Sequence, residues 1–162
     1  LEFASSIICI ILAGKVGSNI ASEIGTMRVT QQIDALDVMG INSANHILLP
    51  KILAMVSAVP LFVTFSVASG FIGAYVVCKL GGFLSMADLT IGLQPCYEGW
   101  HLWTAYIKSF FFAFIIASVS GYFGYTVNGG SIEVGKAGTN SVVVSSVLIL
   151  FADLLLTNLL MA

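Results

Sequence analysis

The stretch AGKVGSNIASEIGTMRVTQQIDALDVMG, from Ala13 to Gly40, is the one long polar segment of this chain, and the rest is organised around it. The chain is 58% hydrophobic and only 9% charged, whereas an ordinary soluble domain carries about 25% charged residues. Its mean hydropathy is +1.02. The composition therefore predicts an all-α polytopic membrane protein, a helical bundle with a single polar segment at its surface.

The polar segment has the pattern of an amphipathic helix, or of a pair of short helices, over residues 22–39. Apolar residues recur there at three-to-four-residue spacing, and polar or charged residues fill the other positions. Ser22 is a suitable N-cap and Gly40 a suitable end. The segment is too short and too charged to cross a membrane. Two interpretations remain open: a connector at the membrane surface, or a docking element for a cytoplasmic partner.

About four membrane helices are expected around this segment. They span residues 1–20, 47–79, 102–128 and 141–162. The uncharged part of the first, Phe3 to Gly14, is too short to cross the membrane alone, so we expect the chain to begin within a helix, with the N-terminal part of the domain missing. Small residues suited to close helix packing occur in two of these spans, at Ser66, Ser69, Gly70, Gly73, Ala74, and at Ala117, Gly121, Gly124.

The basic residues predict the orientation of the chain in the membrane. Lys15, Arg28, Lys51 and Lys136 fall on one side of the expected spans. Because basic residues gather on the cytoplasmic side, segment 22–39 should be cytoplasmic. The loop 129–140 is then cytoplasmic as well, and the connection 80–101 is periplasmic. Residues 1–162 form a single transmembrane domain in this prediction.

Three charged residues fall inside expected spans, where a charge is costly unless it faces protein or a cavity. Glu2 is either an acid at a helix end or an intramembrane group. Lys108 either extends its long side chain outward to the interface or faces a polar cavity. Asp153, near the centre of the last span, should face the bundle interior in a structural role, protonated or paired.

The sequence gives no sign of an enzyme. Gly130 to Lys136, GSIEVGK, has the spacing of a phosphate-binding loop, but Ala137 stands where Ser or Thr would bind magnesium, and a membrane helix precedes it. No cysteine or histidine pattern is typical of a nucleophile or a metal site. A net charge of −2 without a basic block gives no reason to expect nucleic acid. We therefore expect no catalytic residue, no metal site and no cofactor bound by this chain.

The polar segment resembles the signature of MlaE-type permeases, the membrane subunits of ABC lipid transporters that work with MCE proteins. The matching stretches are Ala13 to Ser18, Glu23 to Thr30, Gln32 to Leu36, Pro50-Lys51, Ile107 to Ser109, Gly124-Tyr125, Gly135 to Thr139 and Asp153 to Thr157. The resemblance covers essentially the whole chain. Gln31 stands where the family usually has Glu, and Ser5 where a Pro is common.

The resemblance implies a multi-pass, homodimeric permease in the bacterial inner membrane. Such a permease moves phospholipid between that membrane and a periplasmic MCE protein. ATP and magnesium are bound by a separate ABC ATPase subunit, and a STAS-domain protein is a further candidate partner. The resemblance also implies that segment 22–39 is the coupling helix that docks on the ATPase, with contacts at Glu23, Gly25, Met27, Arg28, Gln32, Asp34 and Asp37.

A central lipid pocket bordered by Glu2, Phe3 and Lys108 is the matching hypothesis for the membrane region. Two alternatives come from other classes of protein. A secondary transporter would use Glu2, Lys108 and Asp153 as an ion relay. A membrane scaffold that transports nothing would tolerate the loss of all three charges.

Overall fold

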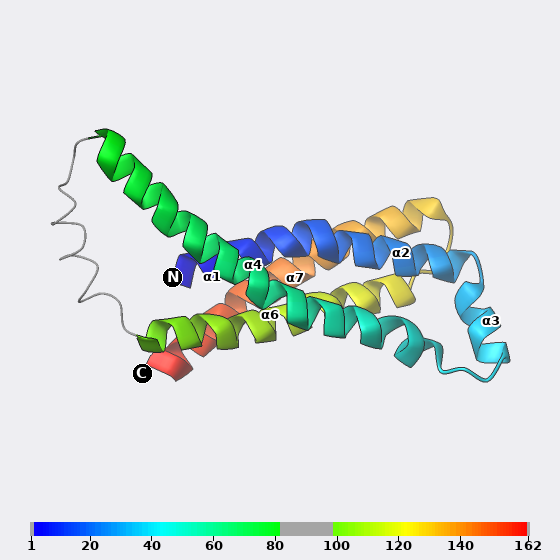
Figure 1. Cartoon of the computed structure of the whole chain (residues 1–162). Coiled ribbons are helices and arrows are strands. Elements are labelled where there is room, and N and C mark those ends of the chain that lie inside the picture. The colour runs from blue at the N-terminus through cyan, green and yellow to red at the C-terminus, as the bar shows by residue number, and fades with distance from the viewer. Residues whose placement is uncertain (1, 82–98, 162) are drawn as a thin grey trace.

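The computed structural model describes residues 2–81 and 99–161, which form a long bundle of helices (Figure 1). The elements are α1 (Glu2–Leu12), one turn of π-helix η1 (Ala13–Gly17), α2 (Ser18–Val29), α3 (Gln32–Val38), α4 (Ser43–Gly81), α6 (Gly99–Tyr125) and α7 (Ser131–Met161). Among the described residues, four stretches are long and apolar enough to cross a membrane: Ser5–Val29, Ser43–Leu80, Gly99–Tyr125 and Ser131–Leu160. The all-α polytopic fold is therefore confirmed.

α1, η1 and α2 follow one another without a break, as a single rod from Glu2 to Val29. The predicted start of a separate helix at Ser22 is wrong, since Ser22 lies inside α2. The physical reason is packing. α2 buries Ile20, Ala21 and Ile24 while it contacts α6 and α7, so the helix continues past the apolar core with its polar residues on the other side.

The rod ends at Val29, shortly before Gln31, whose backbone is left-handed with φ of 60°. This residue separates α2 from α3. The end of α3 is fixed by Gly40, which has φ of 76°. The amide of Ile41 donates to the carbonyl of Leu36 at 3.1 Å and that of Gly40 donates to Asp37 at 3.0 Å, a pairing that closes a helix C-terminus. Gly40 ends the helix as predicted.

The boundaries of the remaining helices differ from the predicted ones. α4 begins at Ser43 rather than residue 47, because the side chain of Asn42 accepts the Asn45 amide at 3.1 Å. α6 lies slightly earlier than the predicted span 102–128. Of the connection predicted over residues 80–101, residues 82–98 lie outside the described residues.

The predicted loop over residues 129–140 is mostly wrong, because α7 already begins at Ser131. Gly129, with φ of 134°, lies in the short turn before it. Ala137 and Gly138 are buried, and a side chain at Gly138 would meet Ser18 and Ser22 of α2. Packing against α2 thus holds these polar turns as a helix. The stretch GSIEVGK consequently lies mostly in a helix, and not in a phosphate-binding loop.

Small residues bring the rod close to α6. A Cβ atom at Gly124 would lie 2.8 Å from the carbonyl oxygen of Ala21, and one at Gly17 would lie 2.9 Å from the Ser120 hydroxyl. Gly121 similarly leaves room for Leu48 of α4. The small residues of α6 that were predicted to allow close helix packing therefore do so at Gly121 and Gly124.

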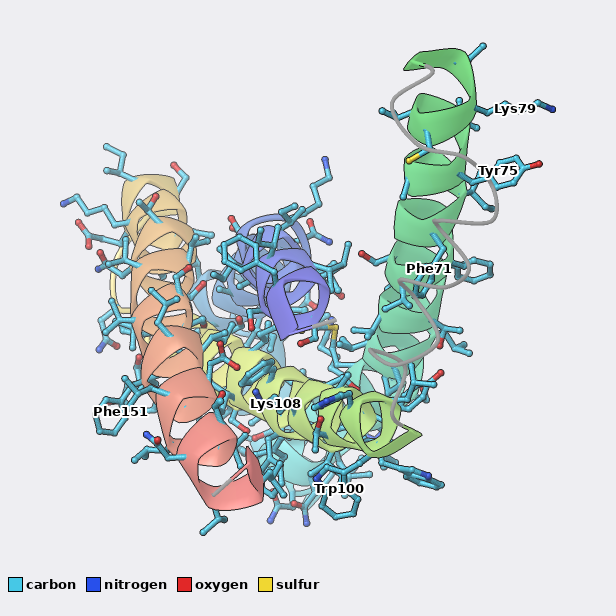
Figure 2. The ribbon with its side chains drawn as sticks, turned by 90° about the vertical axis from the view of Figure 1, so that its left-hand side faces the viewer. Phe71, Tyr75, Lys79, Trp100, Lys108 and Phe151 are labelled. Carbon is cyan, nitrogen blue, oxygen red and sulfur yellow. The ribbon has the colours of Figure 1, made fainter. Side chains whose placement is uncertain are left out.

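The second half of α4 leaves the bundle. Figures 1 and 2 show its end, with Phe71, Tyr75 and Lys79, standing apart from the other helices. A Cβ atom at Gly70 or Gly73 would meet no other atom within 4 Å. None of the described helices therefore packs against Gly70 or Gly73, two of the small residues predicted to allow close packing on α4.

Candidate functional site

α3 lies at one end of the molecule, beyond the ends of the long helices (Figure 1). Arg28 ties it to the bundle. Its guanidinium lies 2.7 Å from the Asp34 carboxylate and 5.8 Å from the centre of the Tyr125 ring. The hydroxyl of Tyr125 in turn lies 2.9 Å from that of Ser43. Arg28 and Tyr125 therefore link α3 with the ends of α2, α6 and α4.

The other predicted docking residues of α2 are also engaged within the chain. The Lys51 amine donates to the Glu23 carboxylate at 2.6 Å, which joins α4 to α2. Gly25 is buried against Val127 and Val134. Met27 is half-buried and packs on the core. The structure thus places these residues where they hold α2 in the bundle.

α3 itself has one buried and one exposed face. Ile33 is fully buried. Gln32 and Asp37 are exposed, together with two apolar residues, Val38 at 88% and Met39 at 65%. The predicted docking set therefore divides. Gln32 and Asp37 are free to meet a partner, and Val38 and Met39 are candidate contacts that the sequence reasoning missed.

A second polar cluster lies inside the membrane bundle, where Lys108 of α6 faces α7 (Figure 2). The Lys108 amine lies 3.2 Å from the Asp153 carboxylate and donates to the Thr157 hydroxyl at 2.7 Å. The Ser6 hydroxyl donates to the other oxygen of Asp153 at 2.8 Å. Three helices, α1, α6 and α7, therefore meet at one buried ion pair.

This cluster bears on the predicted lipid pocket. The Lys108 side chain is 0% exposed, so it does not extend to the interface. Phe3 is 78% exposed on the outer surface of α1. Lys108 thus lies inside the bundle and Phe3 on its surface. The prediction for the Glu2 side chain lies outside the described residues.

Ser6 and Thr157 are partners that the sequence reasoning did not assign. Thr157 follows Asp153 by one helical turn and donates to its backbone carbonyl at 2.7 Å. Two polar residues at that spacing in an apolar helix are a usable signal, because both point to the same side. Ser6 carries no such signal, since small hydroxyl residues are common in membrane helices.

Comparison with known proteins agrees with this architecture. The family model described as Permease MlaE matches residues 1–159. A probable ABC transporter permease protein of Rickettsia bellii is 40% identical over 152 residues, which are 93% of this chain and 58% of that protein. A probable ABC transporter permease protein of Synechocystis is 30% identical over 156 residues, 96% of this chain and 59% of the relative.

A plant protein is similar as well. The chloroplastic protein TRIGALACTOSYLDIACYLGLYCEROL 1 of Arabidopsis thaliana is 31% identical over 157 residues, 97% of this chain and 45% of that protein. The chain thus spans 58% of the length of the Rickettsia bellii relative and less of the plant one. The family match covers nearly every residue of the chain, including α3 and the Lys108 cluster. This multi-pass membrane chain belongs to the MlaE permease family.

Proposed function

We propose that this chain works as the permease of an ABC transporter that moves phospholipid between the bacterial inner membrane and a periplasmic MCE protein. A homodimer of the permease would bind an ABC ATPase, and a STAS-domain protein is a further partner. The family and the names of the relatives support the transporter part. The name of the plant relative, which contains that of a galactolipid, supports a lipid as the substrate.

The observation that carries the proposal is the exposed face of α3. Val38 and Met39 are large apolar side chains at the end of the molecule, outside the long apolar helices, and the exposed Asp37 adjoins them. In this proposal the two side chains form a contact with another protein, which is one of the roles of exposed apolar patches. The carboxylate of Asp37 disfavours the alternative of a membrane surface, because the negative surface potential of the cytoplasmic leaflet repels it.

In this proposal the chain itself is not catalytic, and ATP and Mg²⁺ are bound by the ATPase. Movement of the ATPase displaces α3. Arg28 and Tyr125 pass that displacement to α2, α6 and α4, because they join the ends of these helices. The coupling role thus divides between an exposed contact surface and an internal link.

The docking surface is tested with Asp37→Lys and Val38→Glu combined, in the complete transporter. We expect the ATPase to be lost during purification while the permease still inserts into the membrane. The matched control is Asn128→Lys with Ile132→Glu, which alters two exposed residues near the start of α7. A complex that stays whole with the α3 variant would contradict the docking proposal.

The transport function is tested in reconstituted vesicles. Phospholipid transfer to the MCE protein should require ATP and the intact ATPase. Transfer that continues without ATP, driven by an ion gradient, would favour the secondary transporter. An assembly without any transfer would favour the scaffold.

A further inference from the structure

A polar hollow of about 550 Å³ opens along η1 and the first turns of α2. It is lined by Gly14, Lys15, Val16, Ser18, Asn19 and Ser22. None of these residues belongs to the exposed face of α3 or to the Lys108 cluster. The hollow lies beside the one turn of π-helix in the rod, and such turns are frequent at functional sites.

Lys15 is the charged group of this hollow. Its side chain is exposed, and among residues 2–81 and 99–161 no carboxylate lies within ion-pair distance of its amine. By contrast, Lys51, Lys108 and Lys136 each pair with an acidic side chain. The hollow therefore holds a free cation next to hydroxyl and amide groups, a combination that attracts an anion.

Contacts with α7 indicate the level of the membrane at which the hollow lies. Ser18 and Ser22 lie against Gly138, where a Cβ atom would come within 3.2 Å and 2.9 Å of their hydroxyl oxygens. Gly138 belongs to the polar first turns of α7, and the apolar run of that helix starts at Val142. The hollow thus lies where polar residues give way to apolar ones, which is the level of lipid headgroups on the α3 side of the membrane.

An apolar groove of about 270 Å³ lies next to it, between the rod and α4. Its lining includes Leu12, Val16, Ile20, Met55, Val59 and Phe62. Val16 lines both the groove and the polar hollow. A site with a cationic part and an adjoining apolar part fits a molecule with the same two parts.

We infer that Lys15, Ser18, Asn19 and Ser22 bind the phosphate of a lipid headgroup, and that the groove takes an acyl chain of the same lipid. The lysine provides the charge and the neighbouring side chains provide hydrogen bonds to the phosphate oxygens. This site deepens the proposed function, and its meaning as a step in lipid transport rests on that function. It would receive lipid from the leaflet next to α3.

The test is photolabelling of the complete transporter in lipid nanodiscs, with a phosphatidylglycerol that carries a photoreactive group in its acyl chain. Mass spectrometry of peptides should find label on the groove residues of the rod and α4. Lys15→Gln should lower this labelling about fivefold, the effect expected of one lysine near a lipid phosphate. Lys15→Arg should keep it, and the matched control Lys136→Gln should leave it unchanged.

Two further arms identify the ligand. A photoreactive diacylglycerol, which has no phosphate, should label the groove equally in the wild type and in Lys15→Gln. An excess of inorganic phosphate should leave the lipid labelling intact. Lys15-dependent binding of inorganic phosphate to a transporter whose groove phosphatidylglycerol does not label would overturn the assignment to a lipid headgroup. Equal labelling of wild type and Lys15→Gln by phosphatidylglycerol would overturn the site.

ATP-driven transfer is measured on the same samples, to separate this inference from the proposed function. Normal transfer with labelling that does not depend on Lys15 contradicts the site alone. Labelling that depends on Lys15 in a complex without ATP-driven transfer contradicts the transport proposal alone.

Discussion

Lys108 shows what a single charge requires inside a membrane bundle. Its side chain is completely buried, and it meets the carboxylate of Asp153 and the hydroxyl of Thr157. A buried ion pair gains stability only when its remaining hydrogen bonds are made. Ser6 donates to the Asp153 carboxylate, and Thr157 accepts from the Lys108 amine. The sequence predicts that Lys108 and Asp153 need a polar partner, but the partner depends on how α6 and α7 pack.

We expect Lys108→Met to destabilise the permease by roughly 3 kcal/mol, because the partly buried Asp153 would be left without its cation. Thermal unfolding in nanodiscs measures the effect. The double variant Lys108→Met with Asp153→Leu should recover most of the stability, since it leaves no charge behind. A single variant as stable as wild type would show that the pair is energetically unimportant.

Gly124 presents the opposite requirement, the absence of a side chain. A Cβ atom there would lie 2.8 Å from both the Ala21 carbonyl oxygen and the Ile24 Cβ. We expect Gly124→Ala to cost about 1–3 kcal/mol, because α2 and α6 must move apart. Gly135→Ala is the matched control, since no atom lies within 4 Å of its Cβ position. Equal melting temperatures of the two variants would contradict this account.

At the scale of elements, α3 shows where an amphipathic pattern stops being informative. The pattern over residues 22–39 correctly marks helical structure, and Gly40 correctly marks its end. The pattern cannot separate a new helix from the continuation of an old one, since both place apolar residues at the same spacing. The division comes instead from the left-handed backbone of Gln31. Charges that suggest docking are likewise engaged by neighbours that are distant in sequence, as in the pair of Glu23 and Lys51.

The ion pair of Arg28 and Asp34 is expected to matter for coupling more than for stability. Both side chains are partly exposed, so Arg28→Glu should change the free energy of unfolding by less than about 1 kcal/mol. It should lower ATP-driven lipid transfer by about tenfold, because residue 28 would no longer join Asp34 of α3 to the ring of Tyr125.

The charge swap Arg28→Glu with Asp34→Lys tests this link directly. It restores an ion pair of reversed polarity but not the contact with Tyr125, so transfer should recover in part. Transfer is compared with the ATPase rate of the same reconstituted complex. A swap no more active than the single variant would show that the pair itself does not transmit the movement.

At the scale of the whole molecule, α3 and the end of α4 should lie on opposite sides of the membrane. α4 has 39 residues, which span about 58 Å at 1.5 Å per residue, nearly twice the hydrocarbon thickness. In a variant with all native cysteines replaced by serine, Val38→Cys should react with an impermeant maleimide only from the cytoplasm. Leu80→Cys should react only from the other side. Labelling of both from one side would contradict the topology.

The overall architecture could be predicted because apolar stretches alone locate membrane helices. The positions of four spans follow from the sequence in this way. The extension of α7 back to Ser131 could not be predicted, because its polar first turns depend on packing against α2. The departure of α4 from the bundle is equally invisible in the sequence, since exposed and buried faces of a membrane helix are both apolar.

The unbroken rod from Glu2 to Val29 has a mechanical consequence. Torque applied near α3 travels along one backbone to Ser6, whose hydroxyl holds the Asp153 carboxylate. Within the rod, α2, η1 and α1 follow one another without an intervening loop. The π-helical turn, whose hydrogen-bonded ring is wider than that of an α-helix, is the change of helix type along this path.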